Sequence, residues 1–83
     1  MGLAYRAYLP DMIPMKPADL LRRLRRLASS REWHMVETKG GNHTKVVLNG
    51  KRTVVGRHRT DLKTGTLLGI LKQLGLRPSD LED

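Results

Sequence analysis

Residues 44–55 read TKVVLNGKRTVV, and this stretch decides the fold. Its first part, residues 44–48, is rich in β-branched and apolar side chains, which is typical of a strand. The pair Asn49-Gly50 follows. It is the strongest short-range signal for a two-residue type I′ hairpin turn, because both residue types tolerate the positive φ angles that this turn needs. Residues 51–55 then return as the next strand, so the stretch predicts an antiparallel β-hairpin.

A further strand is predicted just before this hairpin. Residues 33–39, WHMVETK, alternate imperfectly between apolar and polar side chains, and residues 40–42, GGN, form a turn or loop. Because the second strand follows the first so closely, a three-stranded antiparallel meander is the simplest arrangement of the sheet.

Amphipathic helices are predicted on both sides of the three strands. The first covers about residues 17–28, with Pro17 suited to the first helical turn. The second begins near residue 64, with Thr64 or Asp61 as the candidate cap, and Gly75 ends it. Its apolar residues recur at i, i+3, i+4 and i+7, which indicates one buried face: they are Leu67, Ile70, Leu71 and Leu74.

The predicted order of elements is therefore α-β-β-β-α. A three-stranded sheet has an apolar face that must be covered, and the two helices supply that cover. We expect an α+β domain over residues 15–83, with an antiparallel sheet covered on one face by two helices. The other face stays wet, as antiparallel sheets allow, and offers a ligand surface. Residues 1–14 show no clean period and are expected to form a loosely held N-terminal extension, with Met15 as a candidate translation start.

Positive charge dominates the composition. The chain has 83 residues, 16 Lys and Arg against eight Asp and Glu, and a formal net charge of +8. A basic surface kept for solubility is one reading, but the charge favours a polyanionic partner, with nucleic acid first. The polar side of the first predicted helix is either a solvated face or a binding face. It carries Arg22, Arg23, Arg25 and Arg26.

Several protein classes are excluded by what the chain lacks. It has no cysteine, which excludes disulfide scaffolds, Cys-ligated zinc modules and thiol catalysis. It has one Trp, two Tyr and no Phe, too few for a sheet that stacks bases on paired aromatic rings. The three histidines lack metal-binding spacing, so we expect no metal and no cofactor. No apolar run approaches the ~20 residues that span a membrane, so no membrane contact is expected.

Among the three histidines, His43 is the candidate for chemistry. It follows a glycine-rich turn, and glycines permit close approach of a phosphate backbone. Lys39 and Lys45 flank this turn. An imidazole beside cations can act as general base on a ribose 2′-hydroxyl, while the lysines stabilise the extra charge of the transition state. Spacing alone favours a loop histidine without a role.

The other two histidines have simpler readings. His34 falls inside the first predicted strand, where a half-buried or cross-strand side chain is expected. His58 lies between Arg57 and Arg59 in a basic connector. It is a phosphate contact, a second proton-transfer group or a surface histidine, and the sequence leaves these alternatives open.

The stretch from residue 16 to residue 76 resembles the HicA toxin family, also called YcfA-like. The matching features are KPADLL at residues 16–21, KGGNH at residues 39–43, and DLKTGTL at residues 61–67 followed by ILKQLGL at residues 70–76. The resemblance implies a fold similar to the double-stranded RNA-binding domain, which agrees with the order α-β-β-β-α. It also implies the toxin of a type II toxin–antitoxin system, a cytoplasmic ribonuclease that cleaves mRNA. A HicB-like antitoxin is the implied partner, and His43 stands at the position of the family's catalytic histidine.

We therefore expect an endoribonuclease that cuts RNA by metal-independent phosphodiester transfer, with His43 as the base. RNA contacts are expected from Lys39, Gly40, Gly41, Asn42, Lys45, Arg57 and Lys63. One alternative has the same fold and charge without catalysis, a module that binds double-stranded RNA. Another is a DNA-binding regulator that uses the arginine-rich first helix.

Overall fold

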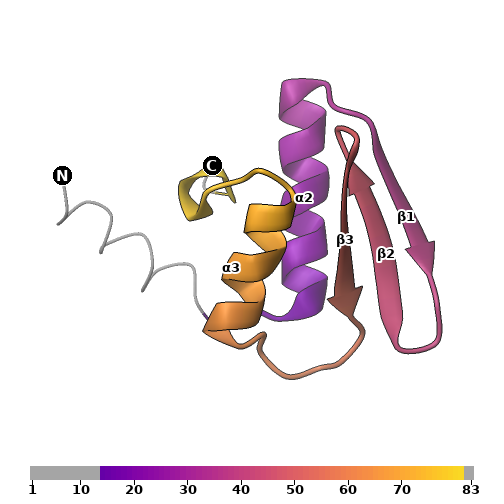
Figure 1. Ribbon diagram of the computed structural model, residues 1–83, viewed down its shortest axis with the longest axis vertical. Coiled ribbons are helices and arrows are strands. Elements are labelled where there is room, and N and C mark those ends of the chain that lie inside the picture. Colours follow the sequence, from indigo (N-terminus) through magenta and orange to yellow (C-terminus); the bar gives the residue numbers. More distant parts are fainter. Residues whose placement is uncertain (1–13, 82–83) are drawn as a thin grey trace, which may run out of the picture.

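The computed structural model describes residues 14–81, and three strands form its single sheet. The elements are α2 (Pro17–Arg31), β1 (Met35–Lys39), β2 (His43–Leu48), β3 (Lys51–Gly56), α3 (Thr64–Gln73) and the 3₁₀ helix η1 (Pro78–Leu81). The sheet is antiparallel in the order β1-β2-β3, and both helices lie on one side of it (Figure 1). The predicted α+β fold, with its α-β-β-β-α order similar to the double-stranded RNA-binding domain, is confirmed. The expected N-terminal extension lies outside the described residues, apart from Pro14.

The β2–β3 hairpin turns at Asn49-Gly50, as predicted. The φ angles of these two residues are 50° and 81°, both positive, as a type I′ turn requires. The turn places Leu48 opposite Lys51, and the same register brings His43 opposite Gly56 at the far end of the hairpin. A two-residue turn therefore determines which backbone lies beside the candidate catalytic histidine.

Side chains alternate across the sheet, as the period of a strand demands. In β2, Thr44, Val46 and Leu48 are buried, whereas His43 and Lys45 are exposed. The helices cover the buried face with leucines of which almost nothing is exposed: Leu20, Leu24, Leu67 and Leu71. Burying each such side chain stabilises the fold by about 2–3 kcal/mol. The core thus holds one face of the sheet and leaves the other, with His43, open to solvent.

The first helix is longer and the first strand shorter than predicted. Ser29 and Ser30 continue α2, and the Ser30 hydroxyl donates back to the carbonyl of Leu27 at 3.3 Å. Serine lowers helix stability only slightly, so packing of the apolar face overrides it. The helix ends at Arg31, the C-cap residue Glu32 has a φ of 56°, and the Trp33 amide donates to the Ala28 carbonyl at 2.8 Å.

Because α2 extends to Arg31, residues 33 and 34 form the connection to β1, and the strand begins only at Met35. His34 therefore lies in the connection between α2 and β1 and is exposed, so its prediction as a half-buried strand residue was wrong. Its carbonyl accepts a hydrogen bond from the Asn49 amide at 2.9 Å. Trp33 is half-buried against the core, and the Arg31 guanidinium lies 5.0 Å from its ring centroid. The cation and the ring stabilise the turn that ends the helix.

The start of α3 also differs from the prediction. Lys63 occupies the cap position with no side-chain hydrogen bond, so neither Thr64 nor Asp61 caps this helix. Leu62 is buried, and its amide donates to the Met15 carbonyl at 2.8 Å. This anchor, rather than a capping side chain, determines where the chain enters the helix.

The predicted stop at Gly75 is confirmed. Its φ is 70°, its amide donates to Lys72, and the Leu76 amide donates to Leu71, which together satisfy the last carbonyls of the helix. The tail then forms η1, in which Leu81 is buried and the Asp80 carboxylate accepts a hydrogen bond from Arg31 at 2.8 Å. Within residues 14–81, neither helix is long and apolar enough to cross a membrane.

Candidate active site

The loop between β1 and β2 is held in shape by backbone hydrogen bonds. The Gly40 amide donates to the His43 carbonyl at 2.7 Å, and the Arg57 amide donates to the Asn42 carbonyl at 2.8 Å. A Cβ atom on Gly40 would lie 3.2 Å from the His43 carbonyl oxygen, whereas one on Gly41 would meet nothing within 4 Å. Gly40 is thus needed for close packing of the loop, while Gly41 faces open space into which a ligand can approach.

A hollow of about 500 Å³ lies beside this loop, and we call it the loop hollow. It is lined by Thr38, Lys39, Gly40, Gly41, Asn42, His43, Lys45 and Val54. Six of the eight residues that the sequence predicted for the site therefore meet at one place. None of the lining residues is acidic, so the hollow is a cationic environment suited to a phosphate group.

His43 is the titratable group of this hollow that is placed to move a proton. It is the first residue of β2, its side chain is exposed, and it lies opposite Gly56, which has no side chain to cover it. Within residues 14–81 its ring makes no hydrogen bond. Both ring nitrogens are therefore open to a substrate, and Lys45, two residues along the same strand, presents its ammonium group on the same face.

Arg57, a predicted RNA contact, also bonds to the glycine loop. Its Nη1 donates to the Gly40 carbonyl at 2.6 Å and lies 3.4 Å from the Gly41 carbonyl. The guanidinium thus joins the end of β3 to the glycine loop. This contact makes Arg57 a positioning residue for the loop that precedes His43.

We expect Arg57→Ala to loosen the loop without unfolding the domain. Loss of a charge-assisted hydrogen bond of about 1.5 kcal/mol corresponds to roughly tenfold faster local opening. Hydrogen exchange followed by NMR measures this at the Gly40 amide. Arg52→Ala is the matched control, because Arg52 is an exposed β3 residue that makes no contact with the loop carbonyls. Equal exchange rates at Gly40 in both variants would contradict the positioning role.

Lys63 lies apart from the other predicted residues. It lines a separate hollow of about 350 Å³ together with His58, Thr60 and Asp61. The carboxylate of Asp61 makes that hollow less favourable for a phosphate. His58 is held by Thr60, whose carbonyl and hydroxyl oxygens lie 3.0 and 3.1 Å from its Nδ1. The structure therefore does not bring Lys63 or His58 to the loop hollow.

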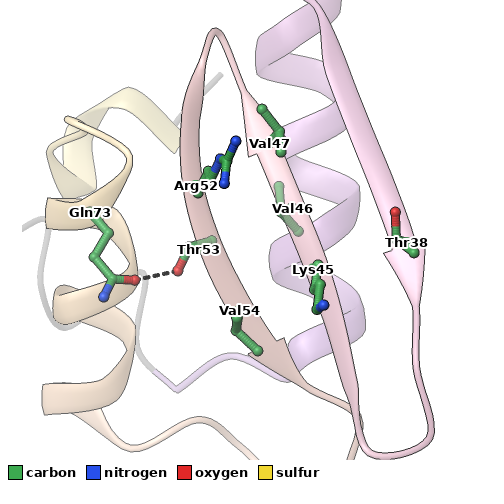
Figure 2. A pocket seen from close by; sticks show the side chains of 8 residues that line it. All are labelled: Thr38, Lys45, Val46, Val47, Arg52, Thr53, Val54 and Gln73. Carbon is green, nitrogen blue, oxygen red and sulfur yellow. Dashed lines mark hydrogen bonds between the residues drawn. The ribbon is translucent and has the colours of Figure 1, made fainter.

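The wet face of the sheet continues from the loop hollow. Thr38, Lys45 and Val54 also line a shallow hollow of about 590 Å³ that extends toward Arg52 and Gln73 (Figure 2). The Thr53 hydroxyl donates to the Gln73 side chain at 2.6 Å and ties the end of α3 to β3. Val36 and Val54 are 43% and 50% exposed on this face. The wet face therefore combines apolar patches with positive charge.

An ion pair between α2 and β1 was not foreseen from the sequence. Arg25 of α2 donates to both carboxylate oxygens of Glu37 in β1, at 2.6 and 2.7 Å. The hydrogen bond from Arg25 lowers the pKa of Glu37, against the opposing effect of burial. Asp19 likewise pairs with Arg22 at 3.1 Å. Two of the four arginines left open as a solvated or binding face are thus paired with the protein's own carboxylates.

A comparison with known protein families shows which family the chain resembles. The family model described as the HicA toxin of bacterial toxin–antitoxin systems matches residues 21–76, which include all three strands and the glycine loop. The chain belongs to the HicA toxin family. The predicted resemblance is confirmed, and membership makes the chain the toxin of a toxin–antitoxin system with an antitoxin as its partner. A search of curated proteins found no match.

Proposed function

We propose that this HicA-family toxin is an endoribonuclease that cleaves mRNA in the cytoplasm, without a metal ion and with His43 as the catalytic base. One observation carries the proposal. The exposed ring of His43 lies in a hollow that it shares with Lys39, Lys45 and a glycine loop, and no acidic residue lines that hollow. Such a site attracts a phosphodiester and holds an imidazole beside it.

The reaction needs a single internal displacement at phosphorus. The ribose 2′-hydroxyl gives its proton to His43, and its oxygen forms a bond to the adjacent phosphorus. The bond from phosphorus to the 5′-oxygen breaks, and that oxygen takes up a proton, which the protonated His43 can return. The products are a 2′,3′-cyclic phosphate and a 5′-hydroxyl. No oxidant, cofactor or metal is required for this balance.

The loop supports this step electrostatically. Negative charge builds on the non-bridging oxygens as the fifth bond forms, and Lys39 and Lys45 stabilise that charge. Gly41 lies in the exposed loop, and a Cβ atom built on it would meet nothing within 4 Å, so a phosphate has room to approach there. Arg57 holds the loop carbonyls, so the loop keeps its shape when the substrate binds.

Incubation of the purified chain with single-stranded RNA tests the proposal. We expect cleavage that continues at an unchanged rate in EDTA, because the proposed chemistry uses only His43 and the lysines. Gel electrophoresis of end-labelled RNA measures the rate. Loss of cleavage in EDTA would contradict the metal-independent mechanism. Binding of double-stranded RNA without any cleavage would instead support the non-catalytic module, which the fold also allows.

For the antitoxin, we propose a HicB-like protein that covers the loop hollow and the wet face. Lys39, Lys45 and Arg52 favour an acidic rim, and the exposed Val36 and Val54 favour apolar anchors at its centre. A cover of this kind blocks the RNA surface and His43 together.

We expect the double variant Lys39→Glu with Lys45→Glu to associate with the antitoxin at least tenfold more slowly at low salt. Stopped-flow fluorescence measures the association rate. The double variant Lys72→Glu with Arg77→Glu is the control, because it makes the same charge change outside the loop hollow. An unchanged rate in the first variant, with His43 still open to modification in the complex, would place the antitoxin elsewhere.

A further inference from the structure

A second hollow lies on the helix side of the glycine loop. It measures about 350 Å³ and lies between the start of α2, the end of β1, the start of β2 and the end of β3. We call it the cationic hollow, because half of its ten lining residues are basic: Arg25, Lys39, Arg57, His58 and Arg59. None of the lining residues is acidic. Its charge therefore exceeds that of the loop hollow.

Much of this charge is not compensated. Arg59 is exposed and makes no ion pair or hydrogen bond within residues 14–81. Arg57 donates to the Gly40 carbonyl, a neutral acceptor, so its full positive charge remains. Arg25 is held in place by the Glu37 carboxylate. Two guanidinium charges without a carboxylate, beside a third that is fixed in position, form a site that attracts an anion.

The shape of the hollow indicates which part of a nucleic acid it accepts. Apart from the basic residues, its walls are small or aliphatic: Pro17, Ala18, Leu21, Thr44 and Gly56. The one aromatic ring among its lining residues is the imidazole of His58, whose Nδ1 lies against Thr60, so the hollow lacks the large Phe, Tyr or Trp rings on which most single-strand readers stack bases. Guanidinium groups match phosphate oxygens in geometry and charge. The hollow therefore fits a backbone phosphate better than a base.

The position of the hollow connects it to the candidate active site. Lys39 lines both the loop hollow and the cationic hollow. Arg57 lines the cationic hollow and contacts carbonyls of the loop that separates the two. An RNA strand bound at His43 thus has a continuous path around the loop into the cationic hollow.

We infer that the cationic hollow binds a backbone phosphate of the RNA that flanks the phosphate cut at His43. The inference rests on the proposed function and extends it: the toxin holds a stretch of strand by two phosphate sites on opposite sides of one loop. Arg59 supplies the principal free charge of the second site.

The test measures RNA binding apart from cleavage. The protein carries His43→Ala, and a labelled ten-nucleotide single-stranded RNA reports the dissociation constant by fluorescence anisotropy. Arg59→Gln is compared with Lys72→Gln, which removes the same charge on exposed α3 surface outside both hollows. A set of RNAs, each with one phosphate replaced by a neutral methylphosphonate, locates the contact. The cut position comes from a separate cleavage assay with the unmodified chain.

We expect Arg59→Gln to weaken binding about tenfold and to lower the salt dependence by about one phosphate contact. Lys72→Gln should change the affinity by less than twofold. A methylphosphonate at one phosphate beside the cut should weaken binding by the same factor as Arg59→Gln. When that RNA is combined with the Arg59→Gln variant, binding should be no weaker than with either change alone.

Equal effects of Arg59→Gln and Lys72→Gln, or additive effects at every phosphate, would overturn the inference. Coupling of Arg59 to the scissile phosphate itself would also overturn it. Unchanged RNA affinity with weakened binding of the antitoxin would overturn it and assign the hollow to an acidic protein surface. If the unmodified chain cleaves no RNA but Arg59 remains coupled to one phosphate, the proposed function fails while the phosphate site stands.

Discussion

Replacing His43 with alanine is expected to lower RNA cleavage by 10²–10⁴-fold and to leave the fold intact. A general base typically contributes about this factor, and the loop hollow is lined by no other histidine and by no carboxylate. The side chain of His43 is exposed and makes no hydrogen bond within residues 14–81, so its loss should change the free energy of unfolding by no more than ~0.5 kcal/mol. Initial rates on labelled RNA and a thermal melt measure the two effects.

His34→Ala is the matched control for this variant. His34 is also an exposed histidine, but it lies in the connection between α2 and β1, away from the loop hollow. We expect it to retain the full cleavage rate. Full activity in His43→Ala would show that another group is the base, and a large fall in its melting temperature would show that His43 is structural.

An RNA with a single 2′-deoxy nucleotide at the cut position is expected to resist cleavage completely. The proposed step uses the 2′-oxygen as the nucleophile, so no substitute for it exists in such a substrate. Cleaved RNA should carry a 2′,3′-cyclic phosphate and a 5′-hydroxyl, which mass spectrometry identifies. The control is the same RNA with the 2′-deoxy nucleotide several positions away, which should be cut at the normal rate.

This experiment distinguishes attack by the ribose 2′-hydroxyl from attack by a water molecule, either of which His43 could activate. If the deoxy substrate is cleaved, the attacking group is water, and the products will carry a linear phosphate instead of a cyclic one. That result would keep His43 as a possible base but would remove the internal displacement. Retention of cleavage in both deoxy substrates and in His43→Ala would refute the whole proposed mechanism.

Local signals in the chain were strong enough to predict most of the fold. Asn49 and Gly50 adopt the positive φ angles that the pair favours, so the hairpin followed from two residues. Gly75 ended the second helix for a similar reason. The errors fell where tertiary packing outweighs weak local preference: Ser29 and Ser30 stay helical, and buried Leu62 sets the start of α3.

The candidate site was predictable only where its residues are neighbours in the chain. Residues 39–45 converge because a short loop between paired strands leaves them no other arrangement. Lys63 looked equivalent to Lys39 in charge, yet the connection after β3 carries it to another hollow. The sequence did not show that Arg57 also bonds to the loop: the end of β3 lies against the loop, so its guanidinium meets the carbonyl of Gly40.

Local sequence patterns and long-range contacts therefore determined different features of this protein. Turn residues, alternation and helical spacing are local properties, and they sufficed for the order of elements, the hairpin and the resemblance to the HicA toxin family. The pairing of Arg25 with Glu37 and the gathering of Arg57 and Arg59 around the start of α2 join residues far apart in sequence. Such contacts depend on how the helices pack on the sheet, and no short-range pattern encodes them. The tertiary structure alone therefore decided that the glycine loop has a cationic hollow behind it.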